Sequence, residues 1–284
     1  MRNVHILLLG IKELSKKNIA QITLIVFLLV SVLDPLSVAL QNIMLDGALL
    51  EGPGAPGKNP FQFWLLMNSV SWGHQVYHTL LWIIPVLLTG MVFFQEQKSA
   101  MLTCQIVRMG RRDYFSSKII ATGVFSFVSI LVILSANLLV TCLVFRDWGV
   151  HSTYYEGILP QVGTFADALY QVSPLCMMFG YTVLNAAALA LLALFALAVQ
   201  MVFRFPNIYV AIIVPVVILY LVSFGMEASP ALHHYSMRFL LQPMAATALE
   251  ATLTPQDLAI TFGGWAAVDA GLLFLGVRRH QEVV

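Results

Sequence analysis

Long uninterrupted apolar runs constrain this chain more than any other feature of its sequence. A helix that crosses a bilayer needs roughly 20 consecutive, mostly apolar residues. Hydrophobic residues make up 59% of the 284 residues and charged residues only 10%, so the sequence is apolar enough for several such helices. We therefore predict an all-α, polytopic membrane protein whose single transmembrane domain covers residues 1–284.

The apolar runs divide the chain into six expected transmembrane helices. Pro35 lies in the first of them and is expected to kink it near its outer end. In the fourth, Ala186, Ala190 and Ala193 form a small-residue face suited to close helix packing. The expected spans are residues 19–40, 74–94, 119–145, 174–203, 208–226 and 257–277.

The remaining segments have distinct characters. Residues 1–17 combine helically spaced apolar residues with basic ones, which favours a helix lying in the inner membrane interface; a cleaved signal peptide is the alternative. Residues 61–73 are expected at headgroup level, with Trp64 and Trp72 as interfacial anchors. Residues 227–256 contain three prolines and predict broken outer helices.

Basic residues predict the orientation of these spans. Lysine and arginine near the ends of spans resist translocation. Six spans put both termini on one side, and 12 of the 15 basic residues fall on that side. We therefore expect an inner or plasma membrane protein with both termini in the cytoplasm. The 12 residues are Arg2, Lys12, Lys16, Lys17, Lys98, Arg108, Arg111, Arg112, Lys118, Arg204, Arg278 and Arg279.

The basic loop between the second and third spans, residues 95–118, is the most distinctive segment. Residues 99–109 (Ser99 to Met109) predict a short helix with an apolar stripe at Leu102, Ile106, Val107 and Met109, and Gly110 is its stop signal. A cytoplasmic helix tied to two spans is what a soluble partner would need in order to push on a membrane protein.

The charges around this helix allow two interpretations each. Glu96 either fixes the angle of the helix by pairing with Arg108 or Arg111, or it is an ordinary solvated charge. The basic run, which also includes Arg112, either contacts a soluble partner or holds anionic lipid headgroups, and the lipid interpretation is favoured. Membrane lipids are therefore expected partners, whereas a net charge of +1 gives no indication of nucleic-acid binding.

Two near-matches to catalytic motifs are rejected. Residues 52–59 nearly match a phosphate-binding loop, but Asn59 replaces the hydroxyl residue that would bind Mg²⁺. We therefore expect no nucleotide site and no enzymatic activity in this chain. His74 and His78 nearly match the metalloprotease signature, but Gln75 replaces the glutamate base. Histidines satisfied by headgroups and water are favoured over a metal or haem contact.

Asp34 and Asp269 are acidic residues inside expected spans. A central charged residue costs on the order of 2.5–3.5 kcal/mol to insert, so each is a candidate for a polar substrate pathway. The alternative for Asp34 is a position high enough in its span to reach water.

The layout as a whole resembles the ABC-2 type permeases, which are the membrane subunits of ABC exporters with the type V fold. The features that carry the resemblance are the N-terminal interfacial helix, six spans, a glutamate where the second span ends and broken helices before the last span. They also include a cytoplasmic helix followed by the motif G-R-R-D-Y-F-S-S-K at residues 110–118.

The resemblance implies a specific assembly. Two permease chains, identical or different, would combine with two ATPase subunits that bind ATP and Mg²⁺. Residues 99–109 would be the coupling helix, and the assembly would export an amphipathic substrate such as a peptide antibiotic, a drug or a lipid-like molecule. Two other classes stay open: a membrane enzyme or metal- or haem-handling component that uses the histidines, and an ion-coupled carrier that uses the two aspartates.

Overall fold

The chain is a multi-pass helical membrane protein. The computed structural model describes residues 2–45, 60–89, 92–99, 101–146, 164–243 and 253–280, and every regular element in these ranges is helical. Five helices are long and apolar enough to cross a membrane, and they coincide with the first, third, fourth, fifth and sixth expected spans. They are α2 (Asn18–Met44), α8 (Arg111–Val144), α10 (Pro174–Val202), α11 (Ile208–Ala228) and α13 (Pro255–Arg279).

The expected second span is not one continuous helix. Residues 74–94 fall into α4 (Trp72–Thr79), α5 (Ile83–Thr89) and α6 (Val92–Lys98). Pro85 explains the break at residues 80–82, because it has no N–H to bond to the carbonyl of Leu81 one turn earlier and is tolerated in the first turn of a new helix. The prediction of an unbroken helix here was wrong.

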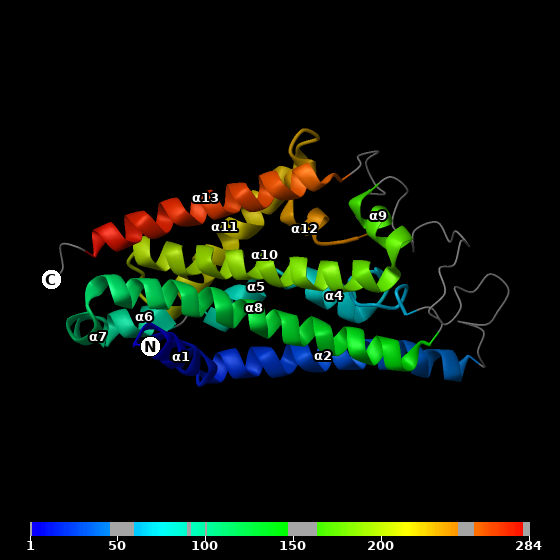
Figure 1. Ribbon diagram of the computed structural model, residues 1–284, viewed down its shortest axis with the longest axis horizontal. Coiled ribbons are helices and arrows are strands. Elements are labelled where there is room, and N and C mark those ends of the chain that lie inside the picture. The colour runs from blue at the N-terminus through cyan, green and yellow to red at the C-terminus, as the bar shows by residue number, and fades with distance from the viewer. Residues whose placement is uncertain are drawn as a thin grey trace.

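The broken segment nevertheless runs along the bundle. At its start, the Gly73 N–H donates to Oδ1 of Asp34 in the second half of α2. At its end, Glu96 bonds to residues in the first turns of α8. Figure 1 shows α4, α5 and α6 following one another between these two ends.

The helix α10 is the central element of the fold. It runs through the middle of the bundle between α8 and α13 in Figure 1. Of the expected small-residue face, Ala186 and Ala193 are fully buried and Ala190 is half-buried, so most of this face does allow neighbouring helices to approach closely. Among these neighbours, α13 comes close at Gly276, where an added Cβ would lie 2.6 Å from Cβ of Met201.

The segment before α4 lies inside the protein rather than at its surface. Trp64, Leu65 and Leu66 are completely buried, so Trp64 is not the exposed interfacial anchor that was expected. The Leu65 N–H donates to Oδ1 of Asn137 on α8, and the Leu65 carbonyl lies 2.8 Å from Nδ1 of His74. These bonds satisfy non-helical backbone that is buried inside the protein.

Two prolines inside long helices each leave a backbone carbonyl without its usual partner. Pro35 in α2 frees the carbonyl of Ser31, which accepts from Nδ2 of Asn137 at 2.7 Å. Pro215 in α11 frees the carbonyl of Ala211, which accepts from Nε2 of Gln200 at 3.2 Å. An amide side chain on a neighbouring helix therefore replaces each lost backbone bond.

The shorter elements fall into two groups. The helices α1 (Arg2–Ser15) and α7 (Met101–Met109) lie at one end, together with the C-terminal end of α13 (Figure 1). Away from that end lie α9 (Phe165–Val172), the 3₁₀ turn η1 (His233–Tyr235) and α12 (Met237–Leu240), and η1 contacts α13 through a bond from Thr261 to the carbonyl of Tyr235.

Some expectations fall partly outside the described residues. Of the broken helices expected over residues 227–256, the first is α12, whereas residues 244–252 are not described. The near-match to a phosphate-binding loop at residues 52–59 is also outside the described ranges.

Candidate functional site

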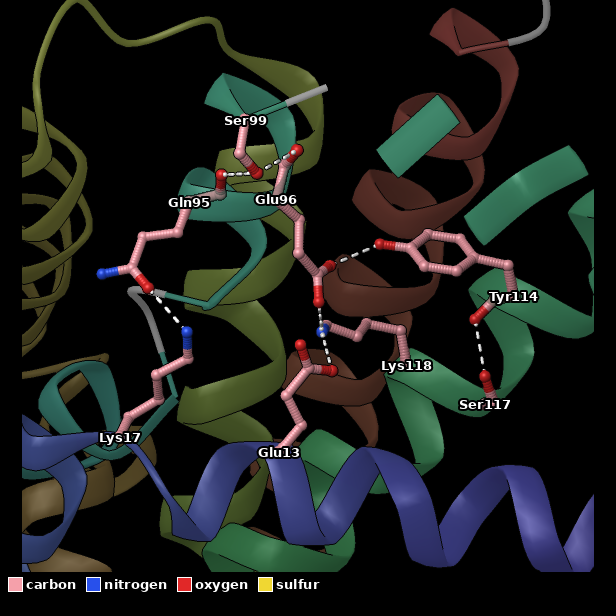
Figure 2. A network of polar contacts seen from close by, with 8 residues as sticks. All are labelled: Glu13, Lys17, Gln95, Glu96, Ser99, Tyr114, Ser117 and Lys118. Carbon is pink, nitrogen blue, oxygen red and sulfur yellow. Dashed lines mark hydrogen bonds and ion pairs between the residues drawn. The ribbon is translucent and has the colours of Figure 1, made fainter. Parts of the chain in front are cut away.

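A buried ion network lies at the end of the bundle that carries α1 and α7. Glu96 at the end of α6 is only 3% exposed. Its Oε2 accepts from the hydroxyl of Tyr114 at 2.6 Å, and its Oε1 lies 2.5 Å from Nζ of Lys118. Figure 2 shows the Tyr114 and Lys118 side chains of α8 converging on this one carboxylate. A buried charge is tolerated when it is paired and hydrogen-bonded in this way.

A second carboxylate from α1 joins the network. Glu13 Oε2 lies 3.8 Å from Nζ of Lys118, so one ammonium group faces two carboxylates (Figure 2). Partial burial raises the pKa of Glu13 above its usual value, and the charge of Glu96 raises it further, although the nearby Lys118 opposes both effects. The network therefore joins α1, α6 and α8 through one lysine.

Neither interpretation of Glu96 is borne out, because it is buried rather than solvated and pairs with Lys118 rather than with Arg108 or Arg111. The reason is that α8 begins at Arg111, well before residue 119. Tyr114 and Lys118 are therefore one helical turn apart on the same face of α8, and that face turns toward Glu96. Arg111 turns instead toward α13, where its guanidinium donates to the carbonyl of Val277.

The helix α7 projects from this network. Gly110 ends it with a φ of +83°, a conformation that residues with a Cβ rarely adopt, and α8 starts at the next residue. Leu102 and Ile106 are buried, in a cluster with Phe93 of α6 and Phe115 of α8. These contacts confirm the expected apolar stripe at those two positions.

The opposite face of α7 has no cover in the described part of the chain. Val107, expected in the buried stripe, is 72% exposed, and Met101 is 51% exposed. Arg108 and Arg112 are exposed as well, and so is Ser99, whose hydroxyl donates to the carbonyl of Gln95. This exposed face, consisting of Met101, Val107 and Arg108, is called the α7 outer face below.

Further hydrogen bonds connect neighbouring helix ends to the region around the Glu96 network. This region is called the α7 base below. Lys17, between α1 and α2, donates to Oε1 of Gln95 at 2.8 Å (Figure 2). Lys98 donates at 2.8 Å to the carbonyl of Pro206, before α11. These residues border an open groove of about 630 Å³ that lies between α1, α6 and the start of α11. The helix α7 therefore packs on the α7 base, and hydrogen bonds and ion pairs connect this base to most of the bundle.

His280, immediately after α13, completes this base. Its ring is 4% exposed and lies against Phe93 and Phe115, with ring centroids 5.8 and 5.9 Å away. Burial lowers the pKa of His280, and the nearby charges of Arg204, Arg111 and Arg279 lower it further, whereas a bond with the Met201 backbone opposes the shift. The folded protein therefore favours the neutral form of the His280 imidazole.

The remaining candidate residues lie elsewhere. Asp34 is fully buried and accepts from the Gly73 N–H and the Ser71 hydroxyl, so it stabilises the start of α4. The alternative of a position that reaches water therefore does not hold for Asp34, and both of these bonds have a structural role. A Cβ on Gly73 would lie 2.5 Å from Cγ of Asp34, which explains the glycine.

His74 and His78 form a buried pair rather than a headgroup contact. Their ring centroids are 4.2 Å apart, and their exposed fractions are 8% and 3%. Gln75 is exposed. Within the described ranges, no group of three or more histidine, cysteine or acidic residues could hold a metal ion. The pair offers two nitrogen ligands at most and no base, which does not favour hydrolytic chemistry.

Asp269 lies inside α13 and is 3% exposed. Neither of its carboxylate oxygens has a hydrogen-bond partner among the described residues. It is therefore unlike Asp34, whose carboxylate is occupied in capping α4.

Sequence reasoning missed Glu13, Tyr114 and His280 as members of the site. Lys118 was noted only as one more basic residue of the loop. The available signal was its position, because a lysine at the start of an apolar run must reach water or a buried partner. Glu96, an acid at the end of the preceding run, is the natural partner.

Comparison with known proteins adds no relative to this description. The chain matches no protein-family model, and no curated protein or solved structure matches it.

Proposed function

We propose that this chain is the membrane permease subunit of an ATP-driven exporter of the ABC-2 type and that it moves an amphipathic substrate outward. The observation that carries the proposal is the contrast between the two faces of α7. One face is buried in a cluster with residues of α6 and α8, and the other presents Met101, Val107 and Arg108 without cover among the described residues. A helix with one face packed rigidly against the bundle and the opposite face exposed suits the docking of a soluble partner.

In the proposed assembly, two ATPase subunits bind ATP and Mg²⁺ and dock on the α7 outer faces of two permease chains. ATP binding draws the ATPases together and displaces α7. The buried face of α7 packs on α6 and α8, and Lys118 joins these two helices to α1, so the displacement passes to α1, α6 and α8 together. ATP can shift such an equilibrium only if the ATPases hold α7 differently in its two states.

The proposed topology has six crossings with both termini in the cytoplasm. Five crossings are the long apolar helices, and the sixth is the broken path of α4, α5 and α6 between Asp34 and Glu96. The charge distribution supports the orientation, because the bonds of Lys17, Lys98 and Lys118 gather at one end of the bundle.

The test is whether an ATPase co-purifies with this chain from native membranes. The rate of ATP hydrolysis by the eluate is then measured. Val107→Asp should abolish both, because a charge would be placed at the centre of the apolar contact. Val70→Asp is the matched control: Val70 is 85% exposed and lies just before α4, in a different part of the chain from α7. This control should retain the partner.

Retention of an ATP-hydrolysing partner by Val107→Asp would exclude the α7 outer face as the docking surface. If the wild-type chain retains no such partner, the exporter proposal itself fails. In that event an ion-coupled carrier becomes the next hypothesis, since Asp269 is a buried acid with no partner in the described structure.

A further inference from the structure

An apolar cavity lies between α10, α11, η1 and α13, away from the α7 end. Its volume is about 400 Å³, within the range of small-molecule sites. Carbon-rich side chains dominate its lining, which includes Phe195, Ile218, Val222, Tyr235 and Trp265. Val222 and Val268, which also line it, are 36% and 48% exposed, so the cavity is open on this face.

The uncompensated acid of α13 is adjacent to this cavity. Asp269 directly follows the lining residue Val268 and is one helical turn from Trp265. It does not itself line the cavity. Trp265, which packs edge-on against Phe195 with ring centroids 5.6 Å apart, stands at the wall next to it.

A carboxylate in this position is complementary to a positive charge. A buried ion without a partner costs several kcal/mol, so the acid either keeps its proton or meets a cation. Neither oxygen of Asp269 has a partner among the described residues. The adjoining indole and phenyl rings also favour a cation, because their faces are negative. An apolar cavity beside an uncompensated acid fits a molecule that is apolar in bulk and positively charged.

We infer that the cavity and Asp269 together form a binding site for lipophilic cations. As a binding site it stands independently, and as the site for exported cargo it rests on the transport function proposed above. The apolar body of the ligand occupies the cavity, and the Trp265 side chain moves to let the positive group approach Asp269. The proton of the acid, where present, is released to solvent as the ion pair forms.

The charge requirement is tested with two probes of nearly the same size and shape, tetraphenylphosphonium and tetraphenylborate. Binding is measured by equilibrium dialysis on the full chain in nanodiscs, without any ATPase. Asp269→Asn should weaken binding of the cation on the order of tenfold or more and leave the anion unaffected. Comparing each variant with the wild type for each probe removes the contribution of lipid partitioning.

Two neighbouring glycines test the cavity itself. Gly264 lines the cavity and Gly263 does not, and a Cβ at either position meets no atom within 4 Å. Gly264→Leu should fill the cavity and weaken cation binding at least as much as Asp269→Asn. Gly263→Leu makes the same change in the same helix and should leave binding unchanged.

The possible results separate the parts of the inference. Unchanged cation binding in a folded Asp269→Asn variant, or equal loss with Gly263→Leu and Gly264→Leu, overturns the site. If Asp269→Asn fails to fold, the two glycine variants still test the cavity and the two probes still test the charge requirement. Tetraphenylborate binding that Gly264→Leu also blocks would overturn the charge requirement. Loss of the site with ATPase docking intact would leave the exporter proposal standing.

Discussion

At the scale of single residues, Lys118 is the member of the candidate site on which the others depend. It is the one cation that contacts both Glu96 and Glu13 among the described residues, and it is 5% exposed. Removing either member of a buried pair leaves an uncompensated charge, whereas replacing both with apolar residues does not. Comparing the replacement of one residue with the replacement of both therefore separates the effect of the pair on stability from its role in transmitting movement between helices.

We expect Lys118→Met to lower the free energy of unfolding by about 3–5 kcal/mol, because Glu96 is left buried and unpaired. The double variant Lys118→Met, Glu96→Leu should recover most of that loss. Unfolding in a detergent titration gives the values, and Lys16→Met, at an exposed position, is the control. A double variant as unstable as the single one would show that the two charges are not coupled.

His280 predicts a pH dependence. Its folded-state pKa is lowered, so below about pH 6.5 the unfolded chain binds a proton more readily than the folded chain does. Its contribution to stability is complete above that pH and is lost as the pH falls toward the lowered pKa. His280→Phe should retain the ring packing and remove this loss.

The measurement is the difference in unfolding free energy between wild type and His280→Phe from pH 7.5 to 5.5. The other histidines are present in both proteins and cancel. The unfolding free energy of His280→Phe should rise relative to that of the wild type as the pH falls. A constant difference across the range would contradict the assignment of His280 as a buried neutral ring.

At the scale of helices, amide side chains compensate for prolines. Gln200 gives the cleaner case, since its Nε2 bonds to the carbonyl freed by Pro215 while its Oε1 has no partner among the described residues. Asn137 does more, because it serves both the carbonyl of Ser31 and the N–H of Leu65. Prolines therefore interrupt these helices without leaving buried carbonyls unsatisfied.

Gln200→Leu should lower the free energy of unfolding by about 1 kcal/mol, since the carbonyl of Ala211 loses its partner. In a Pro215→Ala background the same change should cost close to nothing, because the alanine N–H restores the helix bond. A double-mutant cycle in detergent measures the coupling. Equal losses in both backgrounds would mean that Gln200 acts through packing alone.

Helices could be predicted from sequence where periodicity and length were sufficient. All five long helices follow from apolar runs, and the stop at Gly110 follows from a residue that tolerates positive φ. The break at residues 80–82 was missed because Pro85 can be accommodated in a kinked helix or begin a new one, and only packing decides. The burial of Trp64 was missed because a tertiary bond, donated by the Leu65 N–H to Asn137, holds inside the protein a segment whose composition suits an interface.

At the scale of the whole molecule, the end that carries α7 unites segments far apart in sequence. Arg111 bonds to the carbonyl of Val277, Arg279 to that of Val202, and Lys98 to that of Pro206. Sequence placed basic residues at this end through their charge but could not pair them. Pairing depends on where α8 begins and which of its faces turns inward.

Cys104 is an exposed residue of α7 and reports directly on the central claim that a cytoplasmic ATPase covers this helix. The measurement is the rate at which a membrane-impermeant thiol reagent labels Cys104 in a variant with Cys142→Ala and Cys176→Ala. We predict no labelling in right-side-out vesicles. In inside-out vesicles labelling should be slow while peripheral proteins remain bound and fast once they are stripped. Labelling from the outside, or equal rates before and after stripping, would contradict the account.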